Sequence, residues 1–221
     1  MKAIFVAGTD TGVGKTLVTG LLGRYFIDKG KNVITQKWVA TGRADDIKNH
    51  WRIMGFIPQE SRELILPYTF KLAASPHLAA GYEQKLINKK KIKRSFLTLL
   101  QRYDVVVVEG TGGLLVPINR RSLLIDIVKE LKLPVLLVSR NKVGTINHTL
   151  LSIEALRKRR IPVIGVVFNN LSKTKKIILE DNQKIIRKIS GIPVLGTLPR
   201  SNNINILRNR FKTIGDKIDL P

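Results

Sequence analysis

The segment Gly8-Thr9-Asp10-Thr11-Gly12-Val13-Gly14-Lys15-Thr16 decides the fold of this chain. The apolar residues 3–7 come directly before it and predict a buried strand, and a helical pattern of apolar residues follows it from Val18 onward. A strand, a glycine-rich loop ending in Gly-Lys-Thr, and a helix are together typical of a phosphate-binding P-loop. One more residue separates Gly8 from Gly14 than in the usual pattern, so the sequence predicts a slightly lengthened P-loop.

The residue types in this loop suit the phosphates of a nucleotide. Glycines such as Gly12 and Gly14 let backbone N–H groups turn inward around phosphate oxygens, and the N-terminus of the following helix adds partial positive charge. Lys15 can reach the terminal phosphates, and the Thr16 hydroxyl can bind Mg²⁺. We therefore expect a nucleotide and Mg²⁺ at this loop.

Length and composition indicate a single globular domain, which we place at residues 1–221. Hydrophobic residues make up 43% of the chain and charged residues 25%, which is typical of soluble proteins. No apolar run is long enough to span a bilayer and no signal peptide is evident, so we expect a cytoplasmic protein without membrane contact. The chain has no cysteine, which excludes disulfides and thiolate metal sites.

The chain is strongly basic, because 39 Lys and Arg residues outnumber 16 Asp and Glu residues to give a net charge of +23. Such a charge favours anionic partners, and nucleic acid is one of them. The basic runs 89–91, 157–160 and 173–176 are scattered over several predicted helices, with few aromatic residues among them. Solvated helix faces are the commoner explanation, so we expect no specific binding of nucleic acid.

Apolar runs and amphipathic helical patterns alternate along the rest of the chain. Continuous Val, Ile and Leu runs are typical of strands in a parallel sheet that helices cover on both faces. The sequence therefore predicts an α/β, P-loop NTPase-like fold with a mostly parallel sheet, in which 39–87 is an elaborated connection. The predicted strands are 3–7, 32–36, 104–108, 134–138, 162–168 and 193–197, and the predicted helices include 88–103, one with Ile146, Leu150 and Ile153 inward, and 175–190 with Ile178, Ile185 and Ile189 inward.

Polar residues follow these strands at the edge of the sheet where ligands bind in this fold class. Glu109 ends the third strand, so its carboxylate can face a metal ion that Thr16 also binds. Lys37 ends the second strand, where a lysine can stabilise anionic intermediates. Asp45 or Asp46 could complete the metal shell, although exposed loop carboxylates are more often solvated.

Other residues near this edge leave two interpretations open. Gly110, Gly112 and Gly113 permit close approach of the backbone to an anion, but an ordinary tight turn would use them equally well. His77 and His148 stand beside apolar residues without a partner at metal-ligand spacing, so we expect each to be structural or to make a neutral polar contact, and neither to bind a metal.

Several segments, taken in order, resemble the dethiobiotin synthetase family over residues 3 to about 201. Any one segment is common, whereas the ordered set is specific. The family itself has the lengthened P-loop. The segments are residues 8–16, Lys37-Trp38-Val39-Ala40-Thr41-Gly42, Pro67-Tyr68-Thr69-Phe70, Ser75-Pro76-His77, Val108-Glu109-Gly110-Thr111-Gly112-Gly113, Gly144-Thr145-Ile146-Asn147-His148 and Gly165-Val166-Val167-Phe168-Asn169-Asn170.

The resemblance implies an ATP-dependent ligase that closes a cyclic urea. In the family, CO2 and an amine of 7,8-diaminopelargonate form a carbamate, ATP phosphorylates it, and the second amine closes the ring to give dethiobiotin, ADP and phosphate. The family is a homodimer, and the partner subunit completes the substrate site, which we expect near residues 144–147 of this chain.

The resemblance also implies roles for individual residues. Thr16, Asp46 and Glu109 would hold Mg²⁺, with the choice between Asp45 and Asp46 left open. Lys15, Lys37 and Thr11 would act on the reacting groups, and Thr41 would face the substrate. The nucleotide would contact Gly12, Val13, Gly14, Lys15, Thr16, Leu17, Asp46, Glu109, Gly110, Thr111, Gly112, Asn169, Asn170, Pro199, Arg200 and Ser201.

A partition-type P-loop ATPase that binds nucleic acid is the alternative, and the net charge motivates it. Such ATPases favour a lysine early in the P-loop, where this chain has Asp10 and Thr11. We therefore prefer the ligase.

Overall fold

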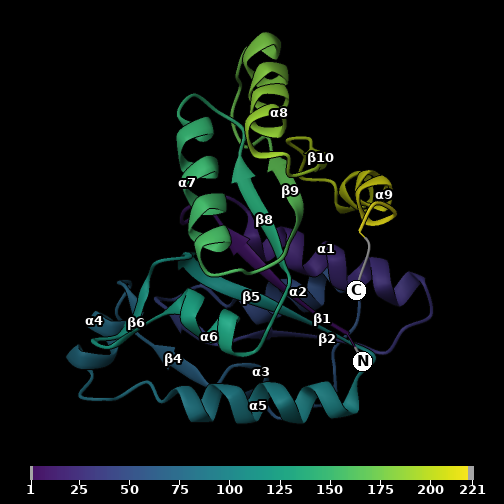
Figure 1. Cartoon of the computed structure of the whole chain (residues 1–221). Helices are drawn as coiled ribbons and strands as arrows, with labels where there is room; N and C mark the ends of the chain where they lie inside the picture. Colours follow the sequence, from purple (N-terminus) through teal and green to yellow (C-terminus); the bar gives the residue numbers. More distant parts are fainter. Residues whose placement is uncertain (1, 219–221) are drawn as a thin grey trace.

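A six-stranded parallel sheet forms the centre of the computed structural model, which describes residues 2–218. Its strand order is β10-β9-β8-β1-β5-β2, so the strand that leads into the P-loop lies in the middle (Figure 1). Crossover helices join these parallel strands, as the alternating sequence pattern predicts. The strands are β1 (Lys2–Gly8), β2 (Val33–Lys37), β5 (Val105–Gly113), β8 (Val135–Arg140), β9 (Val163–Asn169) and β10 (Val194–Leu198).

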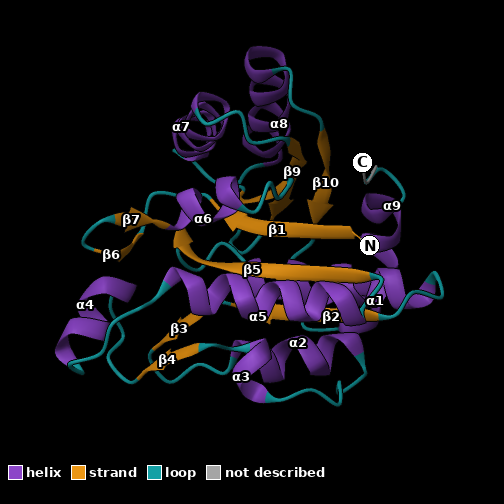
Figure 2. Cartoon of the chain, turned by 60° about the horizontal axis from the view of Figure 1, so that its bottom comes forward, coloured by secondary structure: helices purple, strands orange, loops and turns teal. Residues whose placement is uncertain are grey.

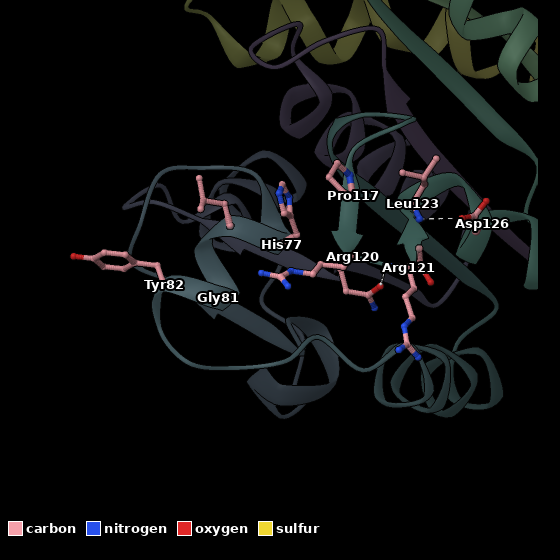
Figure 3. A pocket seen from close by; sticks show the side chains of 11 residues that line it. His77, Gly81, Tyr82, Pro117, Arg120, Arg121, Leu123 and Asp126 are labelled. Atoms are coloured by element: carbon pink, nitrogen blue, oxygen red, sulfur yellow. Dashed lines mark hydrogen bonds between the residues drawn. The ribbon is translucent and has the colours of Figure 1, made fainter.

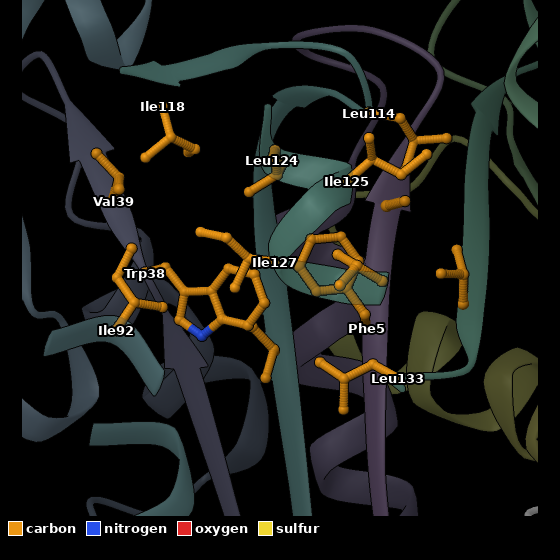
Figure 4. Close-up of a cluster of buried hydrophobic side chains, with 14 of the residues drawn as sticks. Phe5, Trp38, Val39, Ile92, Leu114, Ile118, Leu124, Ile125, Ile127 and Leu133 are labelled. Atoms are coloured by element: carbon orange, nitrogen blue, oxygen red, sulfur yellow. The ribbon is translucent and has the colours of Figure 1, made fainter. Parts of the chain in front are cut away.

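Helices cover both faces of the sheet, because successive side chains of a strand point to opposite faces. Ile4 and Val6 of β1 pack with α1 and α9, while Phe5 and Ala7 belong to the cluster under α5, α6, α7 and α8. Phe5 lies at the centre of that second cluster, with its ring centroid 5.1 Å from that of Trp38 (Figure 4). The helices are α1 (Lys15–Asp28), α5 (Lys89–Arg102), α6 (Leu124–Glu130), α7 (Thr145–Lys158), α8 (Lys176–Ser190) and α9 (Ile204–Gly215).

The connection between β2 and α5 is more ordered than its sequence predicts. It contains a two-stranded parallel sheet and three helices, which gather beside the β2 edge of the main sheet (Figure 2). The helix α2 of this connection packs tightly on α1. A Cβ on Gly20 of α1 would lie 2.7 Å from Cβ of Ile53 on α2, so only glycine fits at position 20. The elements are β3 (Val39–Thr41), α2 (Asp46–Met54), α3 (Arg62–Ile65), β4 (Tyr68–Phe70) and α4 (Pro76–Tyr82).

The predicted fold class and all six predicted strands are confirmed, with two differences of detail. β5 continues to Gly113 instead of ending at residue 108, because it pairs with β1 as far as Gly8. The inward position of Ile189 was wrong: its side chain is 58% exposed, since α8 buries the face that carries Asn182 and Ile186. None of the helices within residues 2–218 is long and apolar enough to cross a membrane.

Candidate functional site

The P-loop joins β1 to α1 and takes a shape that only its glycines allow. Gly12 and Gly14 have φ angles of 70° and 104°, in the left-handed region that disfavours side chains. Asn169, at the end of β9, donates from Nδ2 to the backbone oxygen of Val13 at 3.1 Å. A Cβ on Gly14 would lie 2.0 Å from this Nδ2 atom. The end of β9 therefore holds the loop through Asn169, and a side chain at position 14 would displace the Asn169 amide from this contact.

Lys15 lies inside the loop, with only 6% of its surface exposed. Its Nζ donates to the backbone oxygen of Asp10 at 2.9 Å. Burial lowers the pKa of Lys15 to about 8, although the nearby Glu109 carboxylate acts in the opposite direction. A phosphate at this ammonium would favour its charged form and raise the pKa again.

Nucleotide affinity is therefore expected to depend on pH above about 8. Below that pH Lys15 carries its proton before binding; above it, binding of an anion requires proton uptake, so affinity falls as pH rises. The fall is about tenfold for each pH unit, until the pKa of the bound state is reached. Calorimetry of ADP without Mg²⁺ from pH 7 to pH 9.5 measures it. A Lys15→Ala control should lack the slope, and a flat profile in the parent would contradict the lowered pKa.

Four side chains from four elements meet beside the P-loop. Oγ1 of Thr16, on α1, lies 3.0 Å from Asp46 Oδ1 and 3.0 Å from Glu109 Oε1. Nζ of Lys37 lies 2.7 Å from Asp46 Oδ2 and 2.8 Å from Glu109 Oε1. Lys37 and Glu109 are register partners on β2 and β5, so strand pairing itself brings them together. The predicted convergence of residues 16, 37, 46 and 109 at one edge of the sheet is thus what the structure has.

Burial makes the charges of this cluster interact strongly. Burial alone would lower the pKa of Lys37, but the Glu109 and Asp46 carboxylates outweigh it and hold the pKa above its usual value. Burial would raise the pKa of Glu109, but the Lys37 ammonium and the hydrogen bond from His50 lower it to about 2. Two carboxylates therefore face the Lys37 ammonium, and one oxygen of each lies next to the Thr16 hydroxyl.

The structure distinguishes between Asp45 and Asp46. Asp45 caps the N-terminus of α2, where its Oδ1 accepts from the backbone N–H of Lys48 at 3.1 Å. Its Oδ2 accepts from Arg62 at 3.1 Å, so this carboxylate is already engaged away from the cluster. Asp46 begins the helix, and its carboxylate contacts Thr16 and Lys37. Asp46 is therefore the one of the two that can serve a metal ion.

Several predicted site residues have structural contacts of their own. Gly110 packs against the core, since a Cβ there would lie 2.9 Å from Cζ of Phe5, so close packing explains this glycine without an anion. Thr111 donates from Oγ1 to the backbone oxygen of Val39 and ties β5 to β3. Gly112 has a φ angle of 65°, which explains a glycine at that position by backbone shape.

The other predicted residues lie in loops or at strand ends around this edge. The backbone N–H of Thr11 donates to Asp10 Oδ1 at 2.6 Å in the exposed part of the P-loop. Thr41 ends β3 in the small sheet and is half-buried. Asn170 has a buried Oδ1 atom without a hydrogen-bond partner within residues 2–218. Leu17 belongs to α1, and Pro199, Arg200 and Ser201 form the loop after β10.

Two hollows meet at Pro117, and one of them lies beside the P-loop. One, of about 490 Å³, is lined by Asp10 and Gly113 and, on the α7 side, by His148. The other, of about 930 Å³, lies between α4 and a hairpin formed by β6 (Pro117–Asn119) and β7 (Ser122–Leu123), with His77 and Arg120 among its lining residues (Figure 3). Pro117 lines both hollows, so the surface beside the phosphate loop continues toward the hairpin.

Sequence reasoning missed one residue of the cluster, His50. Its side chain is 0% exposed, and Nε2 lies 2.7 Å from Glu109 Oε2. The sequence signal was its spacing: His50 comes four residues after Asp46, so both side chains share one face of a helix. That signal requires the helix to be recognised first, and we predicted no helix between residues 39 and 87.

Comparisons with known proteins place the chain in a family. A family model described as an AAA domain matches residues 2–206. The ATP-dependent dethiobiotin synthetase of Pasteurella multocida is 38% identical over 192 residues, which cover 85% of this chain and 90% of that protein. The dethiobiotin synthetase of Chlorobaculum tepidum is 42% identical over 190 residues, with 84% and 80% covered. The chain belongs to the dethiobiotin synthetase family. The resemblance predicted from the ordered segments is thereby confirmed.

Solved structures of other P-loop ATPases share the fold of this dethiobiotin synthetase family member. The cell division ATPase MinD of Pyrococcus furiosus superimposes with a TM-score of 0.62 at 15% identity, covering 99% of this chain and 98% of that chain. The MinC:MinD complex of Aquifex aeolicus gives a TM-score of 0.61 at 16% identity, with 99% and 94% covered. This likeness concerns the fold alone, and the more similar sequences favour the ligase over a partition-type ATPase.

Proposed function

We propose that this chain catalyses the ATP-dependent closure of 7,8-diaminopelargonate with CO2 to dethiobiotin, releasing ADP and phosphate, as a cytoplasmic step of biotin synthesis. The observation that supports this most is Lys37, a buried ammonium at the end of β2 that lies beside both the P-loop and two carboxylates. A P-loop ATPase needs no lysine there for hydrolysis alone. A reaction that brings a carbamate against a phosphoryl group does, because two anionic groups must be held together.

The residues around the P-loop have separate roles in this reaction. Lys15 stabilises charge on the transferring phosphoryl group, and Lys37 stabilises the carbamate oxygens and the carbonyl oxygen as the second amine attacks. Thr11 and Thr41 face the diaminopelargonate, as the family resemblance implies. Holding the carbamate and the phosphoryl group in one orientation lowers the activation barrier further, since the entropic cost of bringing the two groups together is met on binding.

Mg²⁺ fits the oxygen atoms that meet at Thr16. The hydroxyl of Thr16 and one carboxylate oxygen each of Asp46 and Glu109 converge there, and hard oxygen donors are what this ion prefers. Among the described residues no group of three or more His, Cys, Asp or Glu side chains is placed to hold a metal, so phosphate oxygens and water would supply the remaining ligands. When bound, the ion neutralises charge on the phosphates.

ATP would lie between the P-loop and the β9–β10 edge. Gly12 to Leu17 would surround its phosphates through backbone N–H groups. Its adenine would lie near Asn169, Asn170 and the loop 199–201, which follow neighbouring strands. The Oδ1 atom of Asn170 is buried and has no hydrogen-bond partner among the described residues, so it is an acceptor that the amino group of a base could satisfy.

A second copy of this chain would complete the substrate site. Leu115, Val143 and Leu151 are large apolar side chains that are 53%, 74% and 55% exposed. Leu115 and Leu151 line the hollow beside Asp10, and Val143 precedes the 144–147 segment where α7 begins. Exposed apolar surface of this kind favours association. We therefore propose a homodimer in which residues near Gly144 to Asn147 of one subunit reach the substrate of the other.

Incubation of the purified protein with diaminopelargonate, bicarbonate, ATP and Mg²⁺ tests the function directly. We expect dethiobiotin, detected by mass spectrometry, in a one-to-one ratio with ADP. Omission of diaminopelargonate should leave little ADP. ATP hydrolysis that is independent of this substrate and is stimulated by DNA at physiological salt would instead support the partition-type alternative.

Replacement of Glu109 by Gln is expected to raise the Mg²⁺ concentration needed for half-maximal activity. An amide oxygen carries no formal charge and binds Mg²⁺ more weakly than a carboxylate does, and losses of about 10–100-fold are typical for a group on which metal binding depends. The measurement is a Mg²⁺ titration at saturating ATP. A Glu130→Gln variant, whose carboxylate pairs with Lys89 on the surface, is the matched control. If the Glu109→Gln titration overlays that of the parent, Glu109 has no role at the metal.

A further inference from the structure

His50 is a buried histidine for which the reaction scheme above has no use. It lies on α2, one helical turn after Asp46, and its Nε2 is 2.7 Å from Glu109 Oε2. Helix α2 therefore presents two side chains to the end of β5: Asp46, which contacts Thr16 and Lys37, and His50, whose Nε2 contacts Glu109.

The contacts determine which ring nitrogen carries the proton. The Glu109 carboxylate offers only acceptor atoms, so Nε2 of His50 must be the donor. Nδ1 is buried, and no atom of the described chain forms a hydrogen bond with it. With its proton on Nε2, the ring donates to Glu109 and leaves Nδ1 as an acceptor.

The two oxygens of Glu109 consequently have separate partners. Oε2 accepts from His50, while Oε1 lies 2.8 Å from Lys37 Nζ and 3.0 Å from Thr16 Oγ1. A carboxylate held at one oxygen cannot rotate freely about its last bond, so the direction of the other oxygen is fixed as well. Hydrogen bonds of this kind orient metal-binding carboxylates, and their loss typically costs about 10–100-fold in metal affinity or activity.

We propose that His50 is a positioning residue: its Nε2–H holds Oε2 of Glu109 and thereby points Oε1 at the place beside Thr16 where a divalent cation binds. The inference rests on the metal role that the proposed function gives to Glu109. It concerns a residue that never touches ATP or diaminopelargonate. Without the donor, Oε2 would be a buried acceptor with no partner, and only the contacts of Oε1 with Lys37 and Thr16 would orient the carboxylate.

Two amide variants separate the hydrogen bond from the bulk of the side chain. In His50→Gln, the side-chain nitrogen lies two bonds beyond Cγ, as Nε2 does in histidine, and can still donate to Glu109. In His50→Asn, the nitrogen lies one bond beyond Cγ, at the place of Nδ1, and cannot reach. Ile53→Val, a small loss of packing on the same helix, is the matched control.

Calorimetry measures the affinity for ADP with and without Mg²⁺. The readout is the increase in ADP affinity that Mg²⁺ causes. We expect His50→Asn to lose about 10–100-fold of this increase. His50→Gln and Ile53→Val should stay close to the parent, and the affinity without Mg²⁺ should be the same in all four proteins. Dethiobiotin formation should follow the same order at limiting Mg²⁺, with little change in KM for diaminopelargonate.

Three results would overturn the proposal: an unchanged increase in His50→Asn, equal losses in the Asn and Gln variants, or an equal loss in Ile53→Val. If His50→Asn does not fold, the result for His50→Gln decides alone. A full loss of the Mg²⁺-dependent increase in ADP affinity in His50→Gln would then count against the hydrogen bond. Because ADP binding needs no diaminopelargonate, a parent that makes no dethiobiotin but retains the Mg²⁺ effect would refute the proposed function and leave the role of His50 standing.

Discussion

Replacement of Lys37 by Met is expected to reduce dethiobiotin formation on the order of 10³-fold or more, the largest effect of any single substitution considered. The ammonium lies against Glu109 and Asp46 and is the positive group placed to hold a carbamate beside the phosphoryl group. ADP binding should weaken far less, because Lys15 and the P-loop backbone remain. The paired measurement is product formation with diaminopelargonate and ADP affinity by calorimetry.

The burial of Lys37 requires a folding control for this variant. Removal of one member of a buried ion pair leaves uncompensated charge and typically costs about 3–5 kcal/mol of stability. Thermal unfolding with ADP and saturating Mg²⁺ shows whether the variant is folded, since the ion can offset the charge of the two carboxylates that Lys37 no longer neutralises. A folded variant that still makes product near the parent rate would show that Lys37 is only a structural partner of the carboxylates.

Replacement of Lys15 by Ala is expected to reduce ATP turnover on the order of 10²–10³-fold, because one preorganised charge at the phosphates is lost. Unlike the Lys37 variant, this one should also bind ADP more weakly. The change removes a hydrogen bond to the loop backbone at Asp10, and that oxygen can turn to water. The variant should therefore fold normally.

Steady-state turnover and ADP calorimetry on the Lys15→Ala protein provide the readouts. Lys188→Ala is a suitable control, since this residue is exposed on α8 and lies outside the proposed site. Near-normal turnover by a folded Lys15→Ala protein would refute the assignment of the phosphate site.

The sequence was most informative where local pattern and strand pairing agree. The P-loop, the six strands and the convergence of Lys37 with Glu109 follow from motif, hydrophobic period and the geometry of parallel sheets. The choice of Asp46 over Asp45 could not follow from spacing, because it depends on which of two adjacent carboxylates caps α2. The same helix explains why His50 was missed, since its proximity to Glu109 exists only after residues 46–54 form a helix against α1.

One wrong prediction and one choice that the sequence left open have similar causes. Ile189 was expected to be buried from periodicity alone, but α8 covers the outer part of the sheet with a narrow face and leaves that side chain 58% exposed. For Gly110 the sequence left an anion contact and a tight turn equally open, and the ring of Phe5 on the adjacent strand adds a packing reason for a glycine there. In both cases the deciding neighbours are distant in sequence, so no local pattern reveals them.

The position of α2 couples metal binding to the integrity of one segment. Asp46 and His50 both belong to the excursion between β2 and α5, whereas Thr16, Lys37 and Glu109 belong to the central framework. Segments outside a central sheet open more often than the sheet itself, and a ligand that bridges the two suppresses such opening. Bound Mg·ATP would thus stabilise residues 46–54 in their position against the central sheet. A mutation anywhere between β2 and α5 that favours opening of this segment would then raise the Mg²⁺ concentration needed for activity, even if it changes no residue of the site.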